Sequence, residues 1–386
     1  MPSGSTFVHL HVHTEYSMLD GASLLNPMFD RVVELGMPAI AMTDHGNLHG
    51  AFDFYAKARE HGVKPIIGME AYLTPGTHRG DRKKTRWGKG NAQEEGGDDV
   101  AGGGAFTHMT MFAESSEGMH NLFRLSSMSS LEGYYYKPRA DRELLARYAK
   151  GIIVTTGCPS GAVQTRLRLG QYDEARREAA ELQDIFGHDN VFLELMDHDL
   201  AIERRVRDDL LRLGKELGIR PIATNDSHYT HPDDASAHEA LLCVQSGSTM
   251  SEPTYAQGGR RFAFEGAGYY IKSAEEMRSL WEDKHDLREA CDNTLLIAER
   301  CEVAFTESNG GYMARADVPD GHTEESWFVE EVWRGVHARY GTDLSDEVRD
   351  RTELEIDVIR QKGYCGYYLV VADFINWAKN NDIRVG

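Results

Sequence analysis

The feature that most constrains the fold is an alternation of short apolar, β-branched runs with longer amphipathic segments, which continues to about residue 246. The amphipathic segments place apolar residues at helical spacing, as at residues 25–36, 51–62 and 200–218. Strand and helix units in succession predict an α/β fold with a parallel sheet, either doubly wound or closed into a barrel. We expect seven strands, at residues 7–13, 38–43, 64–73, 106–113, 151–156, 191–196 and 220–224.

Two segments interrupt this pattern. Residues 74–105 are polar, rich in glycine and without periodicity, which predicts a long flexible loop. Residues 301–323 are typical of a linker, and helix-like segments follow to the end of the sequence. We therefore expect a domain at residues 1–300, a linker at 301–323 and a second region at 324–386. The last residues form a strand-like run, so we expect a truncated C-terminus.

Composition limits the class of protein. Apolar residues make up 41% and charged residues 27%, without a long apolar run or a secretory signal, which predicts a soluble protein with no membrane partner. The five cysteines are scattered, which is typical of a reducing cytoplasm. The net charge of −20 argues against broad attraction to nucleic acid. A local DNA site is still compatible with it, because bound cations can reverse the charge of a carboxylate pocket.

Side chains that commonly bind metals fall at or just after the predicted strands. The carboxyl ends of strands in such sheets form the usual active-site edge, so these side chains are expected to converge there. His11 and His13 are two residues apart and would point to the same face of a strand. The candidate ligands are His11, His13, Asp20, His45, Glu70, His108, Cys158, Asp226 and His228.

The mixture of ligand types indicates the class of metal. Imidazole, carboxylate and a single thiolate suit zinc, manganese or iron better than calcium or magnesium alone. About nine ligands are too many for one site of about four. The sequence therefore predicts two or three divalent metals, with a carboxylate such as Glu70 as a bridge. Metals about 3.5–4 Å apart are typical of sites that hydrolyse phosphoesters.

Ordinary structural roles are the alternative for each residue taken singly. His9 is interpreted as a core histidine, Asp44 as a hydrogen-bond acceptor beside His45, and Cys158 in isolation as a small buried apolar residue. A serine–histidine–aspartate triad around Ser17 has no supporting pattern. Structural or solvent-facing roles are expected for His61, His78 and His120.

Several motifs resemble a known family. The segment HVHTEYSMLDG resembles the first motif of the PHP (polymerase and histidinol phosphatase) superfamily, H-x-H-x-x-x-S-x-x-D-G. AMTDHGNLHGAFDFYAKAREHGVKPIIGMEAYL, TGCPSG, LELMDH and PIATNDSHY are similar, in order, to segments of bacterial DNA polymerase III alpha subunits, in their actinobacterial form. Residues 363–386 resemble the start of that family's palm domain.

The resemblance implies a distorted seven-stranded (βα) PHP barrel that holds three metals, followed by the start of a polymerase palm. One metal would bind His11, His13, Glu70 and Asp226; a second Glu70, His108 and Cys158; and a third Asp20, His45 and His228. Because this ligand set is intact, the resemblance implies an active 3′–5′ exonuclease that proofreads DNA.

The same resemblance implies the partners. These would be a DNA primer–template and, through parts of the protein outside this sequence, other replisome subunits such as the sliding clamp. The family's catalytic aspartates for nucleotide addition, with their magnesium, would lie beyond residue 386, so we expect no polymerase activity from this chain alone.

Two other functions and one local hypothesis stay open. The chain could be a metal-stabilised scaffold for the polymerase, or a stand-alone PHP phosphomonoesterase. The basic side chains of Arg82, Lys83, Lys84 and Arg86 surround Trp87 and predict a DNA contact in which a base stacks on the indole. The alternative for this segment is a solvated loop.

Overall fold

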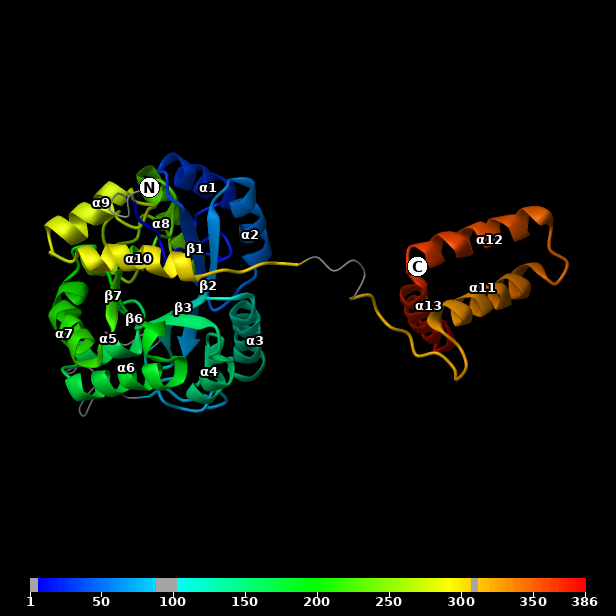
Figure 1. The fold of residues 1–386 in the computed structure, drawn as a ribbon, viewed down its shortest axis with the longest axis horizontal. Coiled ribbons are helices and arrows are strands. Elements are labelled where there is room, and N and C mark those ends of the chain that lie inside the picture. The colour runs from blue at the N-terminus through cyan, green and yellow to red at the C-terminus, as the bar shows by residue number, and fades with distance from the viewer. Residues whose placement is uncertain (1–5, 86, 88–102, 307–311) are drawn as a thin grey trace. The chain divides into compact units, whose positions relative to one another are not determined.

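The computed structural model describes residues 6–85, 87, 103–306 and 312–386 (Figure 1). Residue contacts divide the chain into two units, which we call unit 1, Met1–Phe305, and unit 2, Thr306–Gly386. The end of the chain from 324 is helical, and the connection before it includes residues outside the described ranges.

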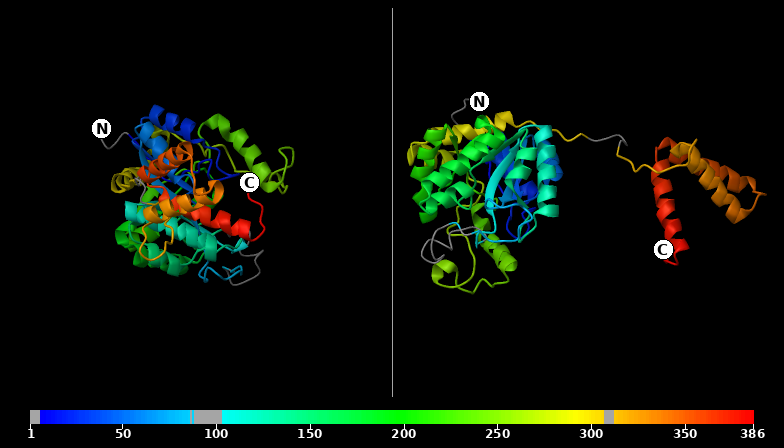
Figure 2. Two further views of the ribbon diagram at one scale, coloured as in Figure 1. Left: turned by 90° about the vertical axis from the view of Figure 1, so that its right-hand side faces the viewer. Right: turned by 90° about the horizontal axis from the view of Figure 1, so that it is seen from below.

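Unit 1 is an α/β domain built on one curled, mixed sheet that forms a half-barrel (Figures 1 and 2). The strands follow the order β1-β2-β3-β5-β6-β7, with β4 beside β2. Six of the seven predicted strands are found within about two residues of their predicted bounds. The strands are β1 (Ala39–His45), β2 (Lys64–Leu73), β3 (Thr107–Ala113), β4 (Arg139–Ala140), β5 (Ile152–Thr155), β6 (Val191–Leu195) and β7 (Arg220–Ala223).

The prediction of a wholly parallel sheet is wrong for β3, which runs antiparallel to both β2 and β5. The other pairs are parallel. Parallel neighbours need a crossover connection, usually a helix, to return the chain to the starting end. In the described part of residues 74–106, between β2 and β3, there is no α-helix. The chain therefore re-enters the sheet from the end at which β2 left it.

The prediction of a strand at residues 7–13 is also wrong, because these residues form no regular strand. Their backbone nevertheless lies between β1 and Ser227. His13 N–H donates to Ser227 O (2.8 Å), and the N–H of Thr43 in β1 donates to Val12 O (2.8 Å). Side chains take the places of backbone acceptors here, since Val12 N–H donates to Thr43 Oγ1 (2.8 Å) and Thr14 N–H to Asp44 Oδ1 (2.7 Å). These side-chain acceptors interrupt the ladder.

The inner face of the sheet changes from apolar to polar along the strands. Alternate residues of a strand point to one face, so Ile66, Glu70 and Tyr72 of β2 share a face. The apolar end of this face packs against the helix α10 (Arg288–Arg300) through Ile297 and neighbouring residues. The polar side chains thus gather toward the carboxyl ends of the parallel strands. The apolar layer comprises Val8, Leu10, Ala39, Ala41, Ile66, Phe112, Ile153, Phe192, Ile222, Ile297, Ala298 and Cys301.

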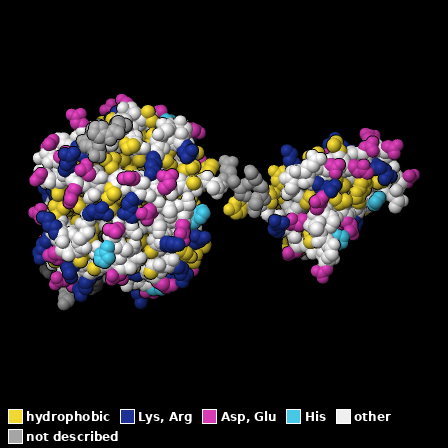
Figure 3. Space-filling model, viewed as in Figure 1, with side chains coloured by type: hydrophobic (Ala, Val, Ile, Leu, Met, Phe, Trp, Pro, Cys, Tyr) yellow, Lys and Arg dark blue, Asp and Glu magenta, His cyan; other side chains and the backbone are white. Residues whose placement is uncertain are grey.

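Helices cover the outer face, as the alternating pattern predicts (Figure 1). The helix α7 (Ala201–Leu217) is typical, because Val206, Leu210 and Leu213 recur at helical spacing and are buried. The helix α8 and the residues after it extend from the body of unit 1 (Figure 2). The face in Figure 3 carries acidic and basic side chains interspersed. The remaining helices are α1 (Leu25–Glu34), α2 (Ala51–Glu60), α3 (Ser116–Glu132), α4 (Arg142–Tyr148), α5 (Ala162–Arg168), α6 (Tyr172–Phe186), α8 (Ala235–Ser246) and α9 (Ala274–Arg278).

Unit 2 contains the helices α11 (Glu324–Tyr340), α12 (Asp346–Gln361) and α13 (Cys365–Asn380). Its core is small and is formed by the buried side chains of Phe328, Ile356, Cys365 and Leu369. Phe374 and Trp377 of α13 are exposed. Among the described residues of the chain, no helix combines the length and the apolarity that a membrane crossing requires.

Candidate metal centre

His11, His13, Glu70 and Asp226 form the first group of candidate ligands. Their side chains come from the irregular segment before β1, from β2 and from the turn after β7. The Nε2 atoms of His11 and His13 are 3.1 Å apart and lie 3.2 and 3.1 Å from Asp226 Oδ1. Glu70 Oε1 lies 3.5 Å from His11 Nε2. These ligand-type atoms surround a common point.

Two further groups adjoin the first through Glu70. His108 Nδ1, from β3, lies 2.9 Å from Glu70 Oε1 and 3.6 Å from Cys158 Sγ. His45 Nδ1, at the end of β1, lies 2.6 Å from Glu70 Oε2, and His45 Nε2 lies 3.0 Å from Asp20 Oδ2. Nε2 of the remaining candidate, His228, lies 3.4 Å from Asp20 Oδ1. The structure therefore brings all nine predicted side chains together, with Glu70 in contact with all three groups.

Several ligand-type atoms in this cluster lack hydrogen-bond partners. Asp20 Oδ1, His45 Nδ1, Glu70 Oε2 and Asp226 Oδ1 are buried and unpartnered among the described residues. His45 Nδ1 and Glu70 Oε2 are close to each other but do not meet in hydrogen-bond geometry. Burial of an unpaired polar atom costs free energy, and bound cations would satisfy these four atoms. The donor set therefore fits a cluster of divalent metals.

The electrostatics of the cluster favour a cation. Burial lowers the pKa of His11, but Asp226 and Glu194 outweigh it and raise that pKa to about 10. Burial opposes ionisation of Glu70 and Asp226, yet the histidines around them hold both pKa values well below the usual range. Burial, with His45 and His228, lowers the pKa of His13 to about 3, which leaves a neutral imidazole. Carboxylates that attract a proton to His11 would also attract a metal ion.

The pKa of the Cys158 thiol also indicates that this site would need a cation. Burial and the carboxylates of Glu70 and Asp226 raise its pKa well above the usual value for a thiol. Only the thiolate is a good metal ligand. A bound cation reverses this balance, since coordination deprotonates the thiol.

Glu194 contacts the cluster and was missed by the sequence reasoning. It lies in β6, is buried, and its Oε1 accepts a 2.5 Å hydrogen bond from His11 Nδ1. Its other hydrogen bonds come from the hydroxyl groups of three threonines, Thr110, Thr155 and Thr224. A carboxylate on Nδ1 fixes the ring so that Nε2 faces a metal. The available signal was a glutamate inside the buried run Val191–Leu195.

The alternatives considered for single residues can now be compared with the geometry. Ser17 Oγ donates to Asp44 Oδ1 (2.7 Å) and lies 3.0 Å from His13 Nδ1, so the order is aspartate–serine–histidine and not that of a nucleophilic triad. His9 Nε2 donates to the backbone carbonyl of Lys272 (2.9 Å) and is buried. His9 therefore has a structural partner outside the cluster.

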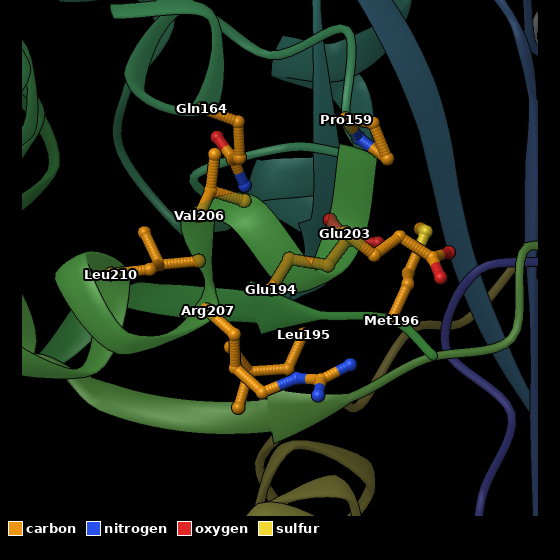
Figure 4. A pocket seen from close by; sticks show the side chains of 9 residues that line it. All are labelled: Pro159, Gln164, Glu194, Leu195, Met196, Glu203, Val206, Arg207 and Leu210. Atoms are coloured by element: carbon orange, nitrogen blue, oxygen red, sulfur yellow. The ribbon is translucent and has the colours of Figure 1, made fainter. Parts of the chain in front are cut away.

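A separate, small pocket lies beside the cluster and is lined by Glu194, Glu203, Gln164, Arg207 and apolar side chains (Figure 4). None of the nine candidate ligands lines it. Glu194 gives its carboxylate oxygens to His11 and the threonines, so it offers no free acceptor to this pocket.

The DNA contact of the basic segment around Trp87 stays a prediction, and the structure places the indole in a packed position. The indole is 6% exposed, and the guanidinium of Arg166 lies 4.3 Å from its ring centroid. Arg166 and Gln171 also donate to the backbone carbonyl of Trp87. Lys83 and Lys84 are exposed, as is Arg82, whereas Arg86 lies outside the described residues. The apolar indole is thus part of the packing between the loop and the body of unit 1.

The fold is PHP-like, and the clustered side chains are consistent with a metal-dependent site of the PHP class. The model of the PHP domain matches residues 9–198, which contain seven of the nine candidates. A second model, described as the bacterial DNA polymerase III alpha NTPase domain, matches residues 326–386.

Curated relatives identify the family. The chain is 54% identical over 385 residues to a DNA polymerase III subunit alpha of Saccharopolyspora erythraea and 53% identical over 386 residues to that of Mycobacterium tuberculosis. These alignments cover 98% and 100% of this chain. The chain belongs to the bacterial DNA polymerase III alpha subunit family, and it spans about 32% of the length of these relatives.

Solved structures are more distant. An amidohydrolase from Chromobacterium violaceum is 14% identical, with a TM-score of 0.33 over 58% of this chain and 88% of that chain. This likeness is too weak to bear on function.

Proposed function

We propose that unit 1 is a metal-dependent phosphoesterase that acts as a 3′–5′ exonuclease and proofreads newly made DNA. The observation that carries this proposal is the convergence of nine buried or half-buried ligand-type side chains, four of which hold an unpartnered buried atom. Metal clusters of this composition are typical of phosphoester hydrolysis. Membership of a replicative polymerase family makes the 3′ end of DNA the substrate that fits.

Three metals are assigned to the three groups of ligands. One would bind His11, His13, Glu70 and Asp226; the second Glu70, His108 and Cys158; and the third Asp20, His45 and His228. When bound, zinc, manganese or iron would supply Lewis-acid stabilisation of charge on the phosphate and its leaving oxygen.

The protein's own groups would position that chemistry. Glu194 fixes the ring of His11, and Ser17 connects His13 to Asp44. His238, from α8, donates to the backbone carbonyl of Asp20 (2.8 Å) and thereby fixes the loop that carries this ligand. The hydrogen bonds of residues 9–13 connect β1 with Ser227, which follows β7, and this connection supports the distorted barrel that the family resemblance implies.

The rest of the protein's role is a wider proposal. The family makes the whole protein a DNA-directed DNA polymerase of DNA replication, with a primer–template and other replisome subunits such as the sliding clamp as partners. Unit 2 would be the start of the palm, and the match over residues 326–386 supports this assignment.

The test compares two substrates for the metal-loaded protein. A DNA primer with a 3′ mismatch should lose its terminal nucleotide as a nucleoside monophosphate, and p-nitrophenyl phosphate should be hydrolysed slowly. The opposite preference would identify a phosphomonoesterase. Bound metal without turnover of either substrate would identify a metal-stabilised scaffold.

A further inference from the structure

A turn of three consecutive tyrosines lies beside the metal centre. It spans residues 134–137 and leads from α3 into β4, which pairs with Tyr72 and Leu73 at the carboxyl end of β2. Tyr72 follows the candidate ligand Glu70 by two residues and shares its face of the strand. The turn therefore lies at the same edge of the sheet as the metal centre.

The side chain of Tyr72 connects the turn with the candidate ligands. The ring centroid of Tyr72 is 5.1 Å from that of His108 and 6.0 Å from that of His45. The Nζ atom of Lys137 lies 5.3 Å from the Tyr72 ring. A Cβ added to Gly46, next to His45, would lie 2.9 Å from both Tyr72 and Pro138, so the turn fits closely against this part of the centre. One layer of side chains separates Lys137 from the candidate ligands.

The turn presents two tyrosines to solvent. Tyr134 and Tyr136 are 61% and 62% exposed. Tyr136 has a φ of +63°, a backbone conformation that is strained for a bulky residue. Such strain persists only where surrounding structure enforces it, and it often marks a functional position.

A buried arginine connects the turn with the loop that follows Arg79. Arg139 has no exposed surface and donates to the backbone carbonyls of Gly133 (3.1 Å), Ala105 (3.0 Å), Arg79 (3.1 Å) and Asp81 (2.8 Å). Its guanidinium also lies 4.9 Å from the ring of Tyr135, which packs against Tyr136. The tyrosine turn and the basic loop after Arg79 are therefore fixed to each other.

The loop adds positive charge to the exposed rings. The Nζ atom of Lys84 lies 5.4 Å from the ring of Tyr136. Within the part of the chain that the structure describes, Lys84 and Lys137 form no ion pair with a carboxylate, nor do Arg82 and Lys83. These cations are available to an anionic ligand although the chain has a net charge of −20.

We propose that Tyr134, Tyr136, Lys84 and Lys137, which we call the tyrosine ledge, bind the single-stranded nucleic acid that leads to the metal centre. Bases stack on the two exposed rings, and the two lysines contact backbone phosphates. This combination of aromatic and cationic side chains is typical of sequence-independent binding to single strands. The identity of the strand as the 3′ end of DNA rests on the proposed exonuclease function.

Binding of a fluorescent oligothymidylate to the metal-loaded protein tests the ledge. The Tyr134→Ala/Tyr136→Ala variant should raise Kd about tenfold or more, since each stacked base contributes measurably to affinity. Tyr340→Ala is the matched control, because Tyr340 is also 61% exposed but lies in unit 2. It should leave Kd unchanged.

The lysines have their own readout in the same assay. Lys84→Ala/Lys137→Ala should reduce the slope of log Kd against log salt concentration by about 1.4, or about 0.7 for each lost phosphate contact with a single strand. Lys150→Ala is the control, because Lys150 is an exposed lysine whose ion pair with Glu117 lies at another part of the surface. An unchanged slope in the double variant would contradict the proposal.

Two further measurements separate the ledge from the exonuclease proposal. Bound metal and hydrolysis of bis(p-nitrophenyl) phosphate should be equal in the parent and the tyrosine variant; a loss of either would make the turn a structural part of the metal centre and overturn the ledge. If the parent binds the strand without hydrolysing it and the variant fails to bind, the ledge stands and the exonuclease fails. The proposed role of the ledge is wrong if the parent removes 3′ nucleotides and the variant has the same KM and Kd. It is also wrong if the parent binds no single strand.

Discussion

Unit 1 and unit 2 differ in what their interiors contain. Unit 1 buries an extensive apolar core together with a cluster of histidines and carboxylates. Unit 2 has four buried apolar side chains at its core, and its ion pairs, such as Arg351 with Glu355, lie at the surface. A charged cluster inside a protein is stable only when its groups are paired or bound to metal. The comparison teaches that unit 1 should depend on a metal, whereas unit 2 should depend on a few apolar contacts.

The largest effect should come from the small core of unit 2. Phe328 is 4% exposed, and Phe328→Ala should destabilise unit 2 by about 3–5 kcal/mol, the usual range for a buried phenylalanine. Hydrogen exchange of the amides in α11, α12 and α13 measures this loss. Phe374→Ala is the control, since Phe374 is 55% exposed and its removal should change exchange little. Loss of bound metal in Phe328→Ala would break the distinction between the units.

A smaller effect should come from the residue that orients His11. Glu194→Gln should lower metal affinity about 10- to 100-fold, the usual cost of removing a group that orients a ligand. Titration with zinc under competition from a chelator measures it. Glu203→Gln is a matched control, because Glu203 is buried and lines the same pocket but bonds to His198 and not to a candidate ligand. Equal affinities of the two variants would show that Glu194 does not position the centre.

The smallest effect should be a pH dependence in the metal-stripped protein. Burial lowers the pKa of His11, but Asp226 and Glu194 raise it from 6.5 to about 10. Because the folded-state pKa exceeds the unfolded one, the stabilisation is complete below pH 6.5 and is lost as the pH rises toward 10. The Tm of unit 1 should therefore fall over this range by more than the Tm of the metal-loaded protein, in which a cation replaces the proton. The same slope in both forms would contradict this account of the cluster.

Much of the sheet could be predicted from the sequence, because buried strands are continuous apolar runs. The bounds of β2, Lys64–Leu73, were predicted to the residue. The direction of β3 could not be predicted, since it depends on the conformation of the connection before it. The irregular course of residues 7–13 depends on the side chains of Thr43 and Asp44, which are distant in sequence.

Part of the candidate site could also be predicted from the sequence, and part could not. The sequence predicted that nine side chains would meet, because ligand-type residues recur at strand ends, and the structure brings them together; their binding of metal stays a prediction. Glu194 was missed because its partner, His11, is 183 residues away. Burial of Trp87 was missed because a loop rich in charge gives no sign that Arg166 covers the indole.

The most direct test of the central claim is the metal content of Asp226→Asn. Asp226 Oδ1 is buried without a hydrogen-bond partner in the described part of the chain and faces both His11 and His13. Asparagine keeps the size of the side chain and removes the charge that would hold a cation. Bound metal per chain should fall and release of the 3′-terminal nucleotide should cease, while circular dichroism stays unchanged.

His9→Ala is the control in the same measurement, because His9 bonds to the backbone of Lys272 and lies outside the candidate set. It should keep its metal and its activity. If Asp226→Asn retains the metal content and the cleavage rate of the parent, this cluster is not the exonuclease centre.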